Sequence, residues 1–204
     1  MISKKHKATF IHIPKTGGST ISAVLSQNSF KRLPERIKEH KNRATNPLEW
    51  TIKHSRIDDL EMQYQNNFCF AFVRNPWDLM VSSFHYWTQN VKLRSRKDYG
   101  HNLKIKGFKA FIVSHSSYIN ECYHRNKGQL YWLNNKVNFI GRFENLQEDF
   151  NIACDKIGIA HQKLPFSNKT KHKHYTEYYD DKTKNIVTEK YAKDIEYFGY
   201  EFGE

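Results

Sequence analysis

The sequence contains few cysteines, and these are widely spaced. Cys69, Cys122 and Cys154 form no CxxC pair and are odd in number. A disulfide framework or a zinc site needs paired or closely spaced cysteines, so this pattern suggests neither. We expect buried structural thiols instead.

Long apolar runs are also missing. The longest, residues 68–73, holds six residues, and the other candidate, 108–113, is interrupted by Lys109, whereas a helix that crosses a bilayer needs about 20. Residues 1–7 are basic, as at the start of a signal peptide, but the apolar stretch after them is short and leads into a glycine turn without a small-residue cleavage site. The sequence therefore predicts a cytoplasmic protein without a transmembrane segment.

Acidic residues are fewer than basic ones. The 204-residue chain has 21 Asp and Glu against 33 Lys and Arg, which gives a net charge of +12. Solubility does not require this excess, so the charge points to an anionic partner: nucleic acid, a membrane surface, an acidic polymer or a multiply phosphorylated small molecule. With 38% hydrophobic residues the chain can bury a core, and its length suits a single domain over residues 1–204.

Strand-like segments alternate with helical patterns along the chain. Short β-rich runs occupy residues 8–13, 67–73 and 137–140. Helical spacing of apolar residues covers 19–26, 77–88, 144–157 and a last stretch from Asp180 or Asp181 to Phe198. A turn is expected at Gly141 and Arg142. This alternation predicts an α/β fold with a central, mainly parallel sheet flanked by helices.

The first strand-turn-helix unit has the features of an anion-binding loop. Gly17 and Gly18 let the backbone approach a phosphate closely, and the start of the next helix directs N–H groups toward it. Lys15 adds a positive charge. Because Lys15 precedes the glycines, the loop differs from the GxxxxGK[ST] loop of nucleoside triphosphate enzymes, and the usual Mg²⁺-binding hydroxyl has no assured position.

A second unit begins where the strand 67–73 ends. Arg74 follows the strand, Asn75 can cap the next helix, and Asp78 lies near the positive end of that helix. Ser82 lies about one and a half turns into the helix. A phosphate between Arg74 and Ser82 would receive a forked cationic donor and a hydroxyl.

The two motifs resemble those of sulfotransferases that use 3′-phosphoadenosine-5′-phosphosulfate (PAPS), especially the Golgi carbohydrate type related to heparan 2-O-sulfotransferases. The resemblance rests on residues 10–20 and 72–83 and extends through 140–146, 168–174 and 178–202. It is weak in residues 28–50 and 90–130. We expect the acceptor to be recognised there, because loops carry recognition on a fixed scaffold.

The resemblance implies a P-loop-like three-layer fold, PAPS as the sulfuryl donor, adenosine 3′,5′-bisphosphate as the product, and no metal. It implies that Arg74 and Ser82 bind the 3′-phosphate. Arg142 and a lysine of the loop 168–174, Lys171 or else Lys169 or Lys173, would complete the nucleotide site or hold an anionic acceptor. The residues implied to bind the 5′-phosphosulfate are Lys15, Thr16, Gly17, Gly18, Ser19 and Thr20. Lys15 would also act in catalysis.

The transfer needs a base for the acceptor hydroxyl. Ser55 and Asp58 form a capping-box-like helix start that places His54 at the mouth of a helix. Related 2-O-sulfotransferases have a catalytic histidine in a comparable place, and an imidazole with a pKa of about 6.5 can accept a proton at cytoplasmic pH. We therefore predict His54 as the general base, although other sulfotransferase branches use a glutamate.

The expected partner is a hydroxyl-bearing acceptor, a carbohydrate or polysaccharide that can itself be anionic, and not nucleic acid. Two alternatives stay open. A divergent P-loop kinase would need a hydroxyl and an acidic residue that hold Mg²⁺ near the loop. A noncatalytic polyanion-binding module would bind through the basic loops, with an affinity that collapses as salt is raised. The sequence leaves the oligomeric state open.

Overall fold

The computed structural model of the chain describes residues 1–31, 56–60, 62–89, 104–113, 128–133, 136–165 and 172–204. The chain divides into two compact units, each made of two stretches. The first unit comprises Met1–Val73 and Tyr131–Asn168, and the second comprises Arg74–Leu130 and Lys169–Glu204. One of the three boundaries along the chain falls within the short helix α6 (Leu130–Leu133). A single domain over residues 1–204 stays a prediction.

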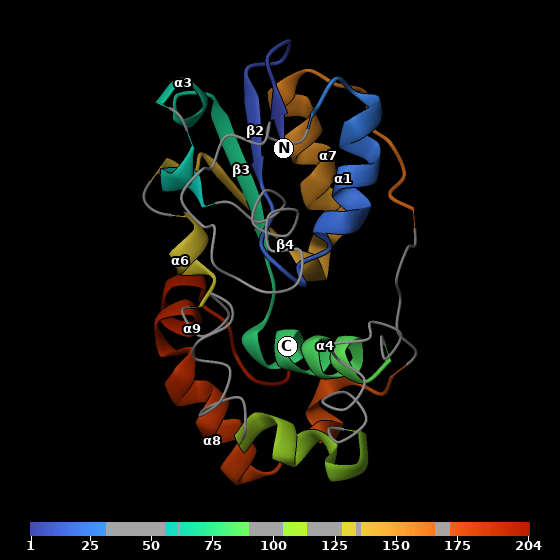
Figure 1. Cartoon of the computed structure of the whole chain (residues 1–204), viewed down its shortest axis with the longest axis vertical. Coiled ribbons are helices and arrows are strands. Elements are labelled where there is room, and N and C mark those ends of the chain that lie inside the picture. The colour runs from blue at the N-terminus through green and yellow to red at the C-terminus, as the bar shows by residue number, and fades with distance from the viewer. Residues whose placement is uncertain (32–55, 61, 90–103, 114–127, 134–135, 166–171) are drawn as a thin grey trace, which may run out of the picture. The chain divides into compact units, whose positions relative to one another are not determined.

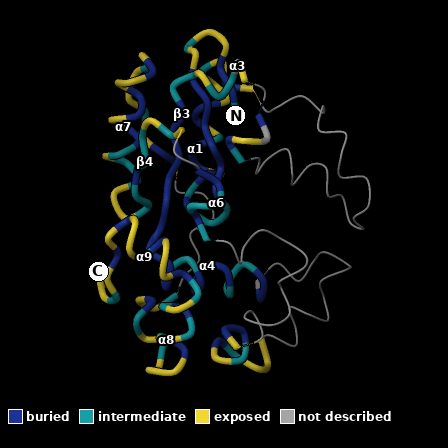
Figure 2. Tube along the Cα trace, turned by 90° about the vertical axis from the view of Figure 1, so that its left-hand side faces the viewer, coloured by how far each residue is buried: buried dark blue, intermediate teal, exposed yellow. Residues whose placement is uncertain are grey.

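A four-stranded sheet in the order β1-β2-β3-β4 forms the centre of the first unit (Figure 1). The strands are β1 (Ile2–Ser3), β2 (Ala8–Ile11), β3 (Phe68–Val73) and β4 (Phe139–Arg142). β1 pairs antiparallel with β2, whereas β2, β3 and β4 are mutually parallel. Figure 2 shows that β3 is buried along most of its length, as expected of a central strand. The predicted α/β fold with a mainly parallel sheet is confirmed.

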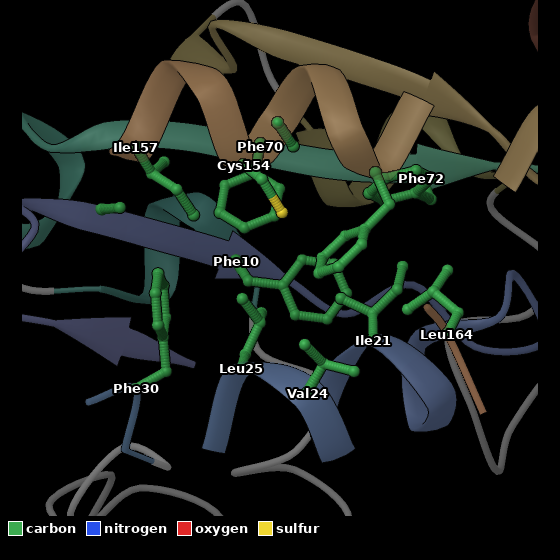
Figure 3. Close-up of a cluster of buried hydrophobic side chains, with 13 residues drawn as sticks. Phe10, Ile21, Val24, Leu25, Phe30, Phe70, Phe72, Cys154, Ile157 and Leu164 are labelled. Atoms are coloured by element: carbon green, nitrogen blue, oxygen red, sulfur yellow. The ribbon is translucent and has the colours of Figure 1, made fainter. Parts of the chain in front are cut away.

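One face of this sheet packs against α1 (Gly18–Gln27) and α7 (Leu146–Ile157) (Figures 1 and 3). The even-numbered side chains of β2 and β3 point to this face, because side chains alternate along a strand. The core there is rich in aromatic rings, and those of Phe10 and Phe70 lie 5.3 Å apart between centroids. Its buried members are Ala8, Phe10, Ile21, Val24, Leu25, Phe30, Phe70, Phe72, Phe150, Ala153, Cys154, Ile157 and Leu164.

Two odd-numbered side chains, Thr9 of β2 and Cys69 of β3, contact α3 (Met62–Gln65), which follows the short turn η1 (Ile57–Asp59). The hydroxyl of Thr9 and the thiol of Cys69 both donate to the carbonyl of Tyr64, at 3.0 and 3.6 Å. Burial raises the pKa of Cys69, and it raises the pKa of Cys154 to about 11. These two are therefore the buried, protonated thiols that we predicted, whereas Cys122 lies outside the described residues.

The second unit is helical where it is described. Its elements are α4 (Pro76–Gln89), a helix over 104–113, η6 (Tyr175–Tyr178), α8 (Asp181–Lys190) and α9 (Ala192–Phe198). Phe84 of α4 packs against Phe108 and Phe111, with ring centroids 5.6 and 5.5 Å away. Trp77 and Trp87 of α4 are buried. No helix among the described residues is both long and apolar enough to span a bilayer.

Two local predictions are wrong. The expected turn at Gly141 and Arg142 lies inside β4, where the two residues pair with Phe72 and Val73. Glycine is required at 141 because a Cβ there would lie 2.5 Å from the ring of Phe72. Gly141 is therefore present because of packing within a strand, and not because of the turn that its sequence predicted.

The predicted single helix that ends at Phe198 is two helices. The chain leaves helical geometry at Tyr191, with φ −109° and ψ 20°, between α8 and α9. The Tyr191 ring is buried, and its hydroxyl donates to the sulfur of Met80 at 3.3 Å. The apolar spacing of residues 187, 191 and 195 continues across the break, so the helical pattern does not reveal it.

Candidate active site

The loop that follows β2 lies at the carboxyl edge of the sheet. β2, β3 and β4 are parallel and end at Ile11, Val73 and Arg142 along this edge. Ligands of open α/β sheets bind outside this edge, because the connections there lead from strands into helix N-termini. Residues 12–17 form such a connection, and α1 begins at Gly18. The predicted strand, glycine turn and helix are confirmed.

The backbone of this loop takes two left-handed conformations. Lys15 has φ 70° and Gly17 has φ 80°. The carbonyl of Gly17 accepts the N–H groups of Thr20 at 3.0 Å and Ile21 at 3.2 Å, which starts α1. Glycine adopts this conformation without strain, but for Lys15 it costs about 1–3 kcal/mol. Strain of this kind clusters at ligand sites, so the lysine is placed at the expense of stability.

The start of α1 favours an anion. Thr16 is buried, and its hydroxyl donates to the carbonyl of Ile13 at 3.0 Å, which closes the loop upon itself. The first turn of α1 contains no acidic side chain to offset the positive end of the helix. Backbone N–H groups at a helix start point outward, so the loop has the donors that a phosphate or sulfate needs.

Gly18 lies against the imidazole of His12, and a Cβ at position 18 would overlap that ring. His12 is buried and stacks on Phe10, with ring centroids 5.7 Å apart. We expect Gly18→Ala to destabilise the protein by about 2 kcal/mol through overpacking, which lowers the melting temperature by about 6 °C. Gln27→Ala, at an exposed position of α1, is the control and should melt like the wild type. An unchanged melting temperature for Gly18→Ala would contradict this packing.

Arg74 is the first residue after β3 and is buried at 7% exposure. Its guanidinium pairs with Asp78, whose Oδ2 lies 2.8 Å from both Nε and Nη2 of Arg74. Asn75 caps α4, because its side-chain oxygen accepts the N–H of Trp77 at 3.1 Å. The predicted helix start is confirmed. The pairing of Arg74 with Asp78 was not predicted, although their spacing of four residues is typical of such pairs.

Residues 200–204 also hold the start of α4. The side-chain amide of Asn75 donates to the carbonyl of Glu201 at 3.0 Å. Phe202 packs edge-to-face against the rings of Trp77, Tyr175 and Tyr179, at centroid distances of 5.5 to 5.6 Å. The turn that carries Arg74 is therefore fixed by contacts on more than one side.

Sequence reasoning missed two buried residues of the second unit, Gln129 and Asp194. The side chain of Gln129 bonds to the backbone of Arg74, and Asp194 bonds to the backbone of Gln129. Gln129 lies 55 residues from Arg74 and 65 residues from Asp194 along the chain. No local pattern connects positions so far apart, so the structure alone reveals them.

Ser82 is buried on α4, and His85 follows it by nearly one turn. Nε2 of His85 lies 2.8 Å from the hydroxyl of Tyr178, and its ring stacks on His172 with centroids 4.9 Å apart. Burial and, to a lesser extent, the neighbouring His172 lower the pKa of His85 below 6.5. This imidazole pair was not singled out in the sequence.

We expect acidification to destabilise the protein in part through His85. Its folded pKa is depressed, so the unfolded state binds more protons as the pH falls through 6.5, and the free energy of unfolding decreases. Thermal unfolding between pH 7.5 and 5.5 should show a smaller decrease in melting temperature for His85→Gln than for the wild type. Equal decreases would contradict the depressed pKa.

The remaining predicted site residues are only partly described. Arg142 ends β4, and its backbone N–H donates to the carboxylate of Asp149 at 2.5 Å. His54 and Lys171 lie outside the described residues. Lys173 is exposed and pairs with a glutamate one turn away, at 3.3 Å. In the described part of the chain, no three His, Cys, Asp or Glu side chains gather as metal ligands.

The mainly parallel sheet, with the loop of residues 12–17 at its carboxyl edge, is an α/β architecture. A family model described as the sulfotransferase family matches residues 1–201. The chain belongs to this family, and the prediction of a PAPS-dependent sulfotransferase is confirmed. No curated protein matches the chain.

Among solved structures, the chain is similar to the mouse sulfotransferase SULT7A1 in complex with PAP. The two share 16% sequence identity and superpose with a TM-score of 0.48. The similarity covers 95% of this chain and 85% of the mouse chain. The family assignment rests on the sequence match and not on this distant likeness.

Proposed function

We propose that the protein transfers the sulfuryl group of PAPS to a hydroxyl of a carbohydrate or polysaccharide and releases adenosine 3′,5′-bisphosphate. The observation that carries the proposal is the loop of residues 12–17, which leads from the carboxyl edge of the sheet into α1 and holds Lys15 and Gly17 in left-handed conformations. Family membership supplies the reaction class. The loop supplies donors for an anionic group.

The two motifs would bind different phosphate groups of PAPS. Residues 15–20 would hold the 5′-phosphosulfate through backbone N–H groups and the lysine charge. Arg74 and Ser82 would hold the 3′-phosphate, with Arg142 and Lys171 as further cationic contacts. A guanidinium carries five N–H donors in a planar fork and binds phosphate bidentately. Asp78 orients that fork.

In the transfer, the acceptor oxygen forms a bond to sulfur while the bond between sulfur and the 5′-phosphate oxygen breaks. PAPS supplies the activated sulfuryl group when it is bound. His54 would take the proton of the acceptor hydroxyl. Lys15 would stabilise the negative charge that develops on the leaving phosphate oxygen and on the sulfuryl oxygens. Positioning and electrostatics account for the rate, without a covalent intermediate.

The carbohydrate acceptor and the cytoplasmic location are the finer parts of the proposal. The resemblance of residues 10–20 and 72–83 to the Golgi carbohydrate type supports a glycan. The net charge of +12 supports an acidic one. Radiolabelled PAPS offered with an uncharged polysaccharide, a carboxylated polysaccharide, a phenol and a tyrosyl peptide should label the carboxylated polysaccharide most. Preferential labelling of the phenol or the peptide would overturn the carbohydrate assignment.

The donor is tested by calorimetry in moderate salt. Adenosine 3′,5′-bisphosphate should bind tightly without metal, and 5′-AMP should bind far more weakly, because a PAPS site recognises the 3′-phosphate. Preference for ATP with Mg²⁺ would favour a kinase. If no nucleotide binds, and polyanions bind with an affinity that salt abolishes, the protein is a polyanion-binding module.

His54→Ala is expected to lower kcat by a factor of about 10² to 10⁴, the usual contribution of a general base. Binding of adenosine 3′,5′-bisphosphate should stay nearly unchanged, since the imidazole acts on the acceptor. His85→Ala is the control for general effects of losing a histidine. Wild-type turnover by the His54 variant would rule out this base and direct attention to a glutamate.

A further inference from the structure

We infer that Gln129 and Asp194 are positioning residues that hold Arg74 in place for the 3′-phosphate. The inference rests on the proposed function, because it takes Arg74 as the ligand of that phosphate. All three residues belong to the second unit and are buried. Neither Gln129 nor Asp194 belongs to the two motifs from which the site was predicted.

Gln129 bonds to both backbone polar groups of Arg74. The N–H of Arg74 donates to Oε1 of Gln129 at 2.8 Å, and Nε2 of Gln129 donates to the carbonyl of Arg74 at 2.8 Å. A side-chain amide has the same donor and acceptor as a peptide group. Gln129 therefore acts as a strand partner just beyond Val73, the last residue of β3 that pairs with β4. Both bonds are buried, so their loss would leave unpaired polar groups.

Asp194 of α9 holds Gln129 in turn. Its Oδ2 accepts the N–H of Gln129 at 2.5 Å, and its Oδ1 accepts the N–H of Leu130 at 3.1 Å. The preceding residue, Gly128, has φ 73°, and a Cβ there would lie 2.6 Å from Oδ1 of Asp194. The carboxylate can reach the backbone only because position 128 is glycine. Two positions, 128 and 194, thus hold Gln129 in place.

Arg74 is held at its side chain as well as at its backbone. Gln129 fixes the backbone, and Asp78 holds the guanidinium through Nε and Nη2. An arginine that is already ordered loses little conformational freedom when a phosphate binds, which strengthens binding through preorganisation. Loosening the backbone should therefore weaken recognition of the 3′-phosphate selectively and leave the rest of the nucleotide unaffected.

The test compares adenosine 3′,5′-bisphosphate with 5′-AMP by calorimetry, because the first alone carries the 3′-phosphate. Gln129→Met keeps the length of the side chain and removes both bonds to Arg74. We expect it to weaken bisphosphate binding about tenfold, as small misplacements of binding groups do, and to leave 5′-AMP binding unchanged. Asp194→Asn should change the ratio of the two affinities in the same direction, because one of its carboxylate oxygens becomes an NH₂ group.

Asp180→Asn is the matched control. Like Asp194, Asp180 accepts a backbone N–H at a helix start, in this case that of Thr183 at 2.9 Å. It also forms an ion pair with Lys109. Asparagine caps helices as well as aspartate does, so this variant should keep the wild-type affinity ratio. If Gln129→Met melts at a lower temperature but keeps the ratio, its role is merely structural and the inference is overturned.

The wild type provides a second measurement that needs no variant to fold. Exchange of the Arg74 amide, which donates to Gln129, should slow when the bisphosphate binds and should not respond to 5′-AMP, since coupling between two sites is reciprocal. An exchange rate of the Arg74 amide that does not change when the bisphosphate binds would contradict the inference. If the wild type does not prefer the bisphosphate over 5′-AMP, the proposed function fails. If Arg74→Ala loses this preference and Gln129→Met keeps it, the inference alone fails.

Discussion

Replacing Arg74 by alanine is expected to weaken binding of adenosine 3′,5′-bisphosphate about 100-fold. A bidentate, charge-assisted contact of a guanidinium with a phosphate contributes about 2–3 kcal/mol, and 2.7 kcal/mol corresponds to a factor of 100. The side chain of Asp78, 17% exposed, would also lose its cation and present an unpaired negative charge beside the phosphate. Calorimetric titration measures the affinity directly.

The comparison with 5′-AMP separates this effect from general disruption. Arg74→Ala should reduce the affinity for the bisphosphate to nearly that for 5′-AMP, and it should hardly change 5′-AMP binding. Arg74→Lys keeps the charge but not the fork, so it should recover part of the lost affinity. If both nucleotides lose affinity equally, Arg74 supports the fold of α4 and is not the 3′-phosphate ligand.

Replacing Lys15 by glycine is expected to lower kcat by a factor of about 10² to 10³, the usual effect of removing one preorganised electrostatic donor. The same change should stabilise the protein by about 1–3 kcal/mol, because Lys15 has φ 70° and glycine adopts this conformation without strain. Steady-state kinetics and thermal unfolding test the two effects separately. Opposite effects on activity and stability would identify a residue placed for function at the expense of stability.

Lys15→Ala is the matched control for Lys15→Gly. Alanine removes the same charge but keeps a Cβ in the left-handed conformation, so it should lose as much activity and gain no stability. Lys15→Arg keeps a positive charge and should retain part of the rate. Near wild-type kcat in both uncharged variants would contradict a catalytic role for Lys15.

Local sequence patterns predicted the helix and strand starts well, for a physical reason in each case. Asn75 and Pro76 begin α4 because a side-chain oxygen caps the first turn and proline needs no amide hydrogen bond there. Gly17 ends the loop because the chain requires a left-handed residue before α1. Contacts between neighbours in the chain decide such features, so they can be read from short segments.

The sequence failed at two positions that pack against distant side chains. Gly141 resembled a turn, but it lies in β4 because the ring of Phe72 leaves no room for a Cβ. The helical pattern across Tyr191, a buried residue that bonds to Met80, gave no sign of the break there. In both cases the pattern of one segment does not include its packing partner.

The sequence by itself determined the class of fold and the family, because the strand, helix and loop patterns behind both depend on the spacing of residues within short segments. The tertiary structure alone decided what surrounds Arg74. Gln129 bonds to it from 55 positions away along the chain, and Asp194, a further 65 positions along, holds Gln129. These hydrogen bonds form only once the helices are packed. A short motif can specify which residue meets a phosphate, but burial and long-range hydrogen bonds determine how firmly that residue is held.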